Sequence, residues 1–149
     1  MARGLLVIGY GSTLRRDDGV GPAVAGEVED RRLPGVRTVA CTQLTPELAE
    51  TLSRARAAVF VDASLDRSGR VRMRRLEPAD ASQAQILAHA TDPRALLALS
   101  RTLYGRAPRA WMLTIPVADL GFGEELSVTA RDGLRKALRA IRALRRRLP

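Results

Sequence analysis

The sequence predicts an α/β fold, a three-layer αβα sandwich on a mostly parallel, twisted sheet of about five strands. Three observations predict it. Short apolar runs alternate along the chain with longer segments of helical periodicity, as in sheets with crossover helices on both faces. Several runs are apolar throughout, as in parallel strands buried on both sides. The length of 149 residues suits one core, so residues 1–149 are expected to form a single domain.

The first elements follow from this pattern in order. Residues 5–10 form an apolar run that ends at a glycine turn, which predicts a buried strand. Residues 21–32 are expected to be a helix, in which Pro22 is tolerated because it lies in the first turn. Residues 36–43 have a strand-like composition and are expected to form the next strand.

The middle of the chain continues the alternation. Residues 45–55 are expected to form a helix with Thr45 as N-cap, because a proline follows at the first helical position. Residues 57–63 form a second fully apolar strand that ends near an acid. Residues 70–76 alternate in period two with one polar face, which predicts an edge strand.

The last elements include residues that are typical of helix ends. Residues 92–105 are expected to form a helix, capped by Asp92 and stopped by Gly105. Residues 110–117 predict the last inner strand. Residues 127–148 predict a long amphipathic helix, whose apolar face is formed by Leu134, Leu138 and Ile141.

Composition narrows the classes of function. The formal net charge is +9, but much of the excess lies in the last helix, where arginines can be solvated, and few aromatic residues are present for base stacking. We therefore expect no nucleic-acid partner. No apolar segment is long enough to span a membrane, and we expect a cytoplasmic monomer with no membrane partner. The single cysteine, Cys41, can form neither an internal disulfide nor a zinc site alone.

The glycine turn after the first strand is the first unusual feature. Gly9 and Gly11 are followed by two consecutive acids, Asp17 and Asp18. The turn falls short of the dinucleotide fingerprint, because Leu14 stands where a third glycine is needed and no acid ends the second strand. We therefore expect no nucleotide cofactor.

Titratable side chains recur just after strands, where α/β sheets bind ligands. Asp18 follows the first strand, Asp62 closes the third, and His89, the only histidine, precedes the helix over 92–105. Two carboxylates and an imidazole are a plausible divalent-metal set with open coordination positions. Simpler roles stay open: Asp18 can cap a helix, Asp62 can cap a turn, and His89 can be an ordinary loop residue.

Four stretches follow one another in a definite order: "GYGSTLRRDDGVGPAVA", "TPELAETLSRARAAVFVDAS", "AHATDPRALLALSRTLYGRAPRAWMLTI" and "GFGEELSVTA". Together they resemble the [NiFe]-hydrogenase maturation proteases, the endopeptidases that trim the C-terminus of a hydrogenase large subunit. The resemblance covers nearly the whole chain.

The resemblance implies roles for individual residues. It implies that Asp18, Asp62 and His89 recognise nickel, which the precursor supplies in its own active site. It implies that Gly11 and Ser12 contact substrate, although the family commonly has asparagine where this chain has Ser12. Asp17 is interpreted as a turn or cap acid. No Ser-His-Asp or Cys-His set is evident, so no catalytic group separate from the metal site is assigned.

The implied activity is removal of the C-terminal extension from a nickel-loaded large-subunit precursor, which is the expected partner. Two rival classes stay open at this stage. One is a non-catalytic nickel-binding or chaperone-like module in hydrogenase assembly, and the other is a basic nucleic-acid binder.

Overall fold

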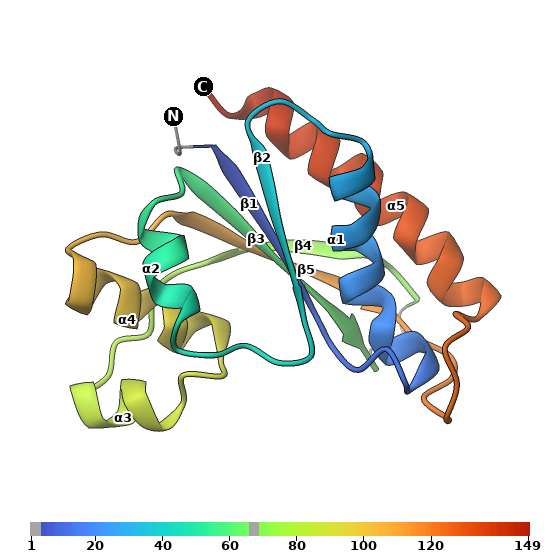
Figure 1. Cartoon of the computed structure of the whole chain (residues 1–149), viewed down its shortest axis with the longest axis horizontal. Helices are drawn as coiled ribbons and strands as arrows, with labels where there is room; N and C mark the ends of the chain where they lie inside the picture. The colour runs from blue at the N-terminus through green and yellow to red at the C-terminus, as the bar shows by residue number, and fades with distance from the viewer. Residues whose placement is uncertain (1–3, 66–68) are drawn as a thin grey trace.

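The computed structural model describes residues 4–65 and 69–149. Five strands form one sheet in the order β2-β1-β3-β5-β4 (Figure 1). The strands are β1 (Leu5–Tyr10), β2 (Val36–Cys41), β3 (Ala57–Ser64), β4 (Arg72–Leu76) and β5 (Arg109–Pro116). β1, β2, β3 and β5 run parallel, whereas β4 pairs antiparallel with β5 at one edge. The predicted mostly parallel sheet and its polar edge strand are both confirmed.

Helices cover both faces of the sheet, as the three-layer prediction requires (Figure 1). One face carries α1 (Val20–Asp30) and α5 (Val128–Arg147). The other face carries α2 (Leu48–Ser53), α3 (Gln83–Ala88) and α4 (Pro93–Tyr104). Strand alternation builds both cores. Val7 and Val59 pack toward α1 and α5, whereas Ile8 and Phe60 pack toward α2 and α4.

Two local predictions were wrong or incomplete. Thr45 is not an N-cap, because its carbonyl accepts the amide of Leu48 in a turn and α2 begins only at Leu48. The short helix α3 was not predicted, although Ser82 and Gln85 form a capping box at its start. Asp92 occupies the N-cap position of α4 as predicted, but its side chain makes no capping hydrogen bond. Gly105 takes a left-handed conformation after α4, with φ of 80°.

Two glycines let α1 begin directly over the ends of the strands. A Cβ atom on Gly9 would lie 1.9 Å from the carbonyl oxygen of Gly21. A Cβ atom on Gly21 would lie 2.6 Å from the carbonyl oxygen of Tyr10 and 2.5 Å from that of Val61. Only hydrogen fits at both positions, so the "GYG…GVG" pattern brings the segment between them against the carboxyl edge of the sheet.

The topology also locates the crevice of the sheet. α1 follows β1 on one face, whereas α3 and α4, which follow β3, cover the opposite face. The chain therefore diverges between the carboxyl ends of β1 and β3, where sheets of this type bind ligands. No helix of the described ranges is both long and apolar enough to cross a membrane.

Candidate functional site at the carboxyl edge

Tyr10 and Asp62 meet at the carboxyl ends of neighbouring strands. β1 and β3 pair up to Gly9 and Val61, so the next residue on each strand lies at the same level. Alternation directs both side chains to the α2 and α4 face, where Tyr10 packs against the core. The Tyr10 hydroxyl and the Asp62 carboxylate are close enough for each to shift the pKa of the other. Tyr10 was not predicted as a site residue, although its alternation with Ile8 was a usable signal.

Asp18 approaches the same crevice from the loop after β1. The Ser12 amide donates to the Asp18 Oδ2 atom over 2.8 Å. Gly11 permits this contact because its φ is +142° and a Cβ atom there would lie 2.0 Å from the Asp18 carbonyl oxygen. The Ser12 hydroxyl accepts the Leu14 amide over 3.3 Å, closing a local turn. The glycine turn therefore holds a carboxylate rather than a phosphate.

The two carboxylates influence each other electrostatically. Burial and, to a smaller extent, the nearby negative charge of Asp18 raise the pKa of Asp62 to about 6, against the opposing hydrogen bonds from the Ala63 amide and Tyr10. Burial, followed by the charge and hydrogen bond of Asp62, also raises the pKa of the Tyr10 phenol. A cation between the two acids would relieve their repulsion.

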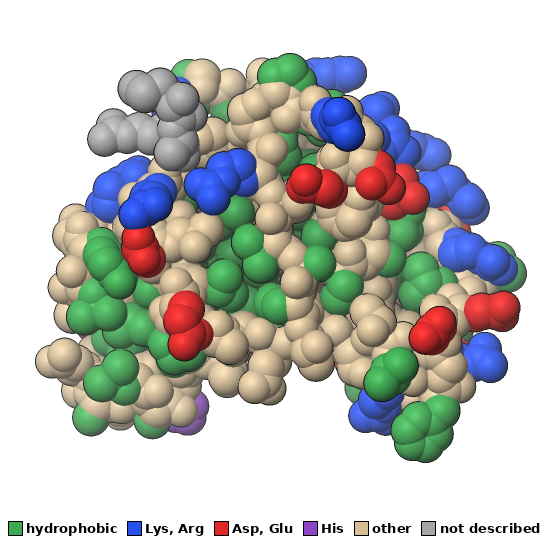
Figure 2. Space-filling model, viewed as in Figure 1, with side chains coloured by type: hydrophobic (Ala, Val, Ile, Leu, Met, Phe, Trp, Pro, Cys, Tyr) green, Lys and Arg blue, Asp and Glu red, His purple; other side chains and the backbone are tan. Residues whose placement is uncertain are grey.

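His89 lies apart from this pair. It follows α3 directly, its side chain is exposed, and its carbonyl accepts the Asp92 amide over 2.8 Å. Figure 2 shows the lower edge of the molecule hollowed between two lobes, with the histidine on the lobe that carries α3. Within residues 4–65 and 69–149, no group of three or more His, Cys, Asp or Glu side chains could hold a metal ion. Nickel recognition by Asp18, Asp62 and His89 together stays a prediction.

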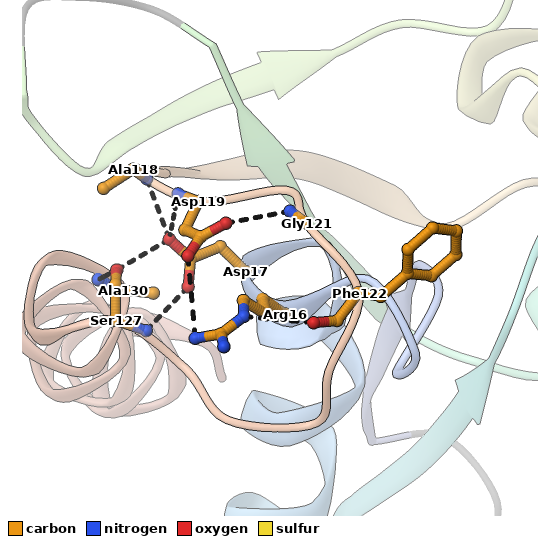
Figure 3. Close-up of polar contacts among 8 residues, drawn as sticks. All are labelled: Arg16, Asp17, Ala118, Asp119, Gly121, Phe122, Ser127 and Ala130. Carbon is orange, nitrogen blue, oxygen red and sulfur yellow. Dashed lines mark hydrogen bonds and ion pairs between the residues drawn. The ribbon is translucent and has the colours of Figure 1, made fainter.

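Unlike Asp18, Asp17 lies in the interior of the protein and contacts only other residues of the chain. Its side chain is fully buried and accepts four hydrogen bonds (Figure 3). The Oδ2 atom accepts the amides of Ala118 and Asp119 over 2.8 and 2.9 Å and the Ser127 hydroxyl over 2.6 Å. The Oδ1 atom accepts the Ser127 amide over 2.7 Å. Asp17 therefore fastens the 118–127 loop and the start of α5 to the loop after β1.

Protonation of Asp17 is opposed by these contacts. Burial alone would raise the pKa of Asp17, but hydrogen bonds from the Ser127 hydroxyl and from the amides of Ser127, Ala118 and Asp119 outweigh it and lower the pKa below 3.8. The carboxylate is thus charged and satisfied in the interior. The two adjacent acids differ completely: Asp17 is structural, and Asp18 is half-buried at the crevice.

Cys41 is not arranged as a nucleophile. It ends β2, is half-buried and unpaired, and burial raises the pKa of its thiol. A thiol in this environment is protonated at neutral pH and reacts poorly. A pocket of about 170 Å³ opens beside it, lined by Gly11, Thr13, Pro22, Ala40, Cys41 and Thr42. A larger pocket of about 420 Å³ lies at the opposite, amino edge of the sheet, away from both carboxylates.

Solved structures with the same fold match at least 95% of the chain. No family model matches the sequence, and no curated protein matches it significantly. The hydrogenase maturating endopeptidase HybD from E. coli matches with a TM-score of 0.75 and 20% identity, over 96% of this chain and 92% of its own. The [NiFe] hydrogenase maturation protease HybD from Thermococcus kodakarensis matches with a TM-score of 0.73 and 20% identity, over 95% and 99%. A hydrogenase 2 maturation peptidase from Thaumarchaeota archaeon SCGC_AB-539-E09 matches with a TM-score of 0.69 and 22% identity, over 95% and 98%. These matches confirm the predicted fold.

Proposed function

We propose that this protein is an endopeptidase that removes the C-terminal extension of a nickel-loaded [NiFe]-hydrogenase large-subunit precursor. The likeness to maturation proteases supports the proposal, because it extends over at least 92% of each of the three neighbouring chains described above. The sequence stretches that resemble this family form the carboxyl edge of the sheet and the helices around it.

The observation that carries the proposal is the pair of carboxylates between β1 and β3. Asp18 and Asp62 come from different elements, the negative charge of Asp18 acts on Asp62, and both lie where this topology binds ligands. Carboxylate oxygens suit a divalent ion, and such an ion would remove the repulsion between them. In the proposed reaction the nickel arrives with the precursor. His89, exposed on the segment before α4, is the third proposed nickel-recognition group.

The chain's own chemistry in this reaction rests on Asp62. Peptide hydrolysis needs a group that takes a proton from the attacking water, and such a base works best with a pKa near the operating pH. Without a bound cation the pKa of Asp62 is about 6, and a nickel ion beside it would lower this pKa and keep the carboxylate in the ionised form that accepts a proton. Tyr10 lies beside this carboxylate at the end of β1. Asp62 is therefore the proposed general base.

Substrate backbone is proposed to lie beside the loop after β1. The pocket of about 170 Å³ next to Gly11 and Thr13 leaves room there for a peptide segment. Gly11 and Ser12 are the proposed substrate-binding residues on this side. The Ser12 amide is already engaged with Asp18, and the Ser12 hydroxyl accepts the Leu14 amide, so the hydroxyl proton is the donor that Ser12 can offer to substrate.

The experiment compares two forms of the large-subunit precursor from the same organism, one loaded with nickel and one without. Each is incubated with the purified protein, and intact mass is recorded. The proposal expects a shorter product from the nickel-loaded form only. An intact nickel-loaded precursor would overturn it. Stable binding of that precursor without cleavage would instead support a non-catalytic nickel-binding or chaperone-like module.

A further inference from the structure

Two loops far apart in the sequence present apolar side chains together at the rim of the carboxyl edge. Leu14, in the loop after β1, is 62% exposed, and Phe122, in the loop before α5, is 90% exposed. Figure 1 shows the two loops side by side at the lower right, and Figure 2 shows hydrophobic side chains protruding there. We call this pair the Leu14–Phe122 patch.

Backbone hydrogen bonds tie the two halves of the patch together. The Gly123 amide donates to the Leu14 carbonyl over 2.9 Å, and the Arg16 amide donates to the Gly123 carbonyl over 2.8 Å. The Arg16 guanidinium donates to the Phe122 carbonyl over 3.2 Å. In Figure 3 the Phe122 ring points away from the contacts that hold its backbone. The backbone around Phe122 is therefore fixed, and its ring projects outward.

Two carboxylates also hold the 118–127 loop that carries Phe122. The Asp119 carboxylate accepts the Gly121 amide over 2.8 Å, and the buried Asp17 carboxylate accepts the amides of Ala118 and Asp119. An exposed aromatic side chain on an ordered loop loses little conformational freedom on binding, which favours its use as an interface anchor. Exposed apolar groups rimmed by polar residues mark interaction sites. Here the rim contains the exposed residues Arg15, Glu124 and Glu125.

The patch is continuous with the proposed active site. Leu14 lies two residues after Ser12, whose amide holds Asp18, and the Ser12 hydroxyl accepts the Leu14 amide. A folded protein that delivers a peptide bond to Asp18 and Asp62 must therefore pass close to the patch. Small peptides could reach the carboxylates without touching it.

We propose that the Leu14–Phe122 patch docks into an apolar depression on the folded body of the precursor, outside the segment that is cut. This inference rests on the proposed function and adds a second contact region to it. The patch selects the folded substrate, whereas Asp18 and Asp62 act at the cleaved bond.

The test is steady-state cleavage of nickel-loaded precursor by the wild type and by the double variant Leu14→Ser, Phe122→Ser. The matched control is Leu103→Ser, Tyr104→Ser, which removes one aliphatic and one aromatic side chain that are 54% and 49% exposed on α4. The patch variant should raise KM at least tenfold and leave kcat within twofold. The control should change neither value. Thermal melts verify that both variants remain folded.

Each outcome decides the proposal. An unchanged KM for a folded patch variant would overturn the docking surface and leave the proposed function intact. A fall in kcat without a change in KM would also overturn it. Light scattering that shows a wild-type dimer and a monomeric patch variant would assign the patch to self-association instead. A wild-type protein that does not cleave the nickel-loaded precursor would overturn the proposed function and this inference with it.

Discussion

At the scale of single residues, Asp17 and Asp18 of the "DDG" stretch have different roles. Asp17 is fully buried and takes four hydrogen bonds from the 118–127 loop and Ser127. Asp18 is half-buried and faces the crevice, held by the Ser12 amide. The sequence interpretation assigned Asp17 to a turn or cap. The structure shows that it fastens the start of α5, which lies 110 residues away in the chain.

Replacing Asp17 by asparagine should strongly destabilise the fold. Asparagine has one acceptor oxygen and an NH₂ group that would face the donating amides, so at least one buried donor loses its partner. The expected cost is about 3 kcal/mol at pH 7, or roughly 6–12 °C in Tm. Asp132 on α5 supplies the control, because it forms a solvent-exposed ion pair with Lys136. Asp132→Asn should therefore leave Tm unchanged.

The loss of stability caused by Asp17→Asn should depend on pH. The folded pKa of Asp17 lies below its ordinary value of 3.8, so its stabilisation is present above about pH 4 and is lost as pH falls through the folded pKa. The Tm difference between the wild type and Asp17→Asn should therefore narrow in acid. A difference that stays constant down to about pH 2 would contradict this account.

Asp62→Asn should have the opposite effect on stability. The folded pKa of Asp62, about 6, lies above its ordinary value of 3.8, so its ionisation costs stability as pH rises between these values. Asparagine keeps an acceptor for Tyr10 and removes the charge. We expect a gain of about 1 kcal/mol at pH 7, reduced by solvent screening of the half-buried group, and no gain at pH 4. Chemical denaturation at both pH values measures it, and a loss at pH 7 would contradict the interpretation.

At the scale of elements, the helix and strand periods located every strand and, apart from α3 and the short 3-10 helix Arg16–Gly19, every helix of the described residues. That helix spans six residues and buries only Ile86, so it has too few turns for an apolar stripe to show in the sequence. Its capping box was the available signal. The misplaced start of α2 has a similar cause, because a turn that contains Thr45 has the same residue pattern as an N-cap.

The start of α5 depends on Ser127 in two ways. Its hydroxyl accepts the Ala130 amide over 3.1 Å as an N-cap and contacts Asp17. Ser127→Ala should cost about 2 kcal/mol, because it removes a cap and a hydrogen bond to a buried charge. Ser82→Ala removes a cap of the same kind from α3 without a buried acid, and it should cost clearly less. Equal losses in chemical denaturation would show that the Asp17 contact adds nothing.

At the scale of the whole molecule, parallel topology explains how much of the site was predictable. Carboxyl ends of parallel strands share one edge, so residues that follow β1 and β3 must lie near each other, as Asp18 and Asp62 do. The position of His89 depends on α3 and on the turn to Asp92, and strand periodicity does not determine either. The Leu14–Phe122 patch was also not predicted, because it forms from two loops whose pairing appears only in three dimensions.

Asp18 is proposed to act on the nickel site of the precursor rather than to serve merely as a helix cap. The most direct measurement is the intact mass of nickel-loaded precursor after incubation with the wild type or with Asp18→Asn, alongside a thermal melt of each. Asparagine preserves an acceptor for the Ser12 amide and removes only the charge. The account predicts a fall in cleavage rate of more than about 100-fold in a variant that melts near the wild-type temperature. Normal cleavage by a folded Asp18→Asn variant would contradict it.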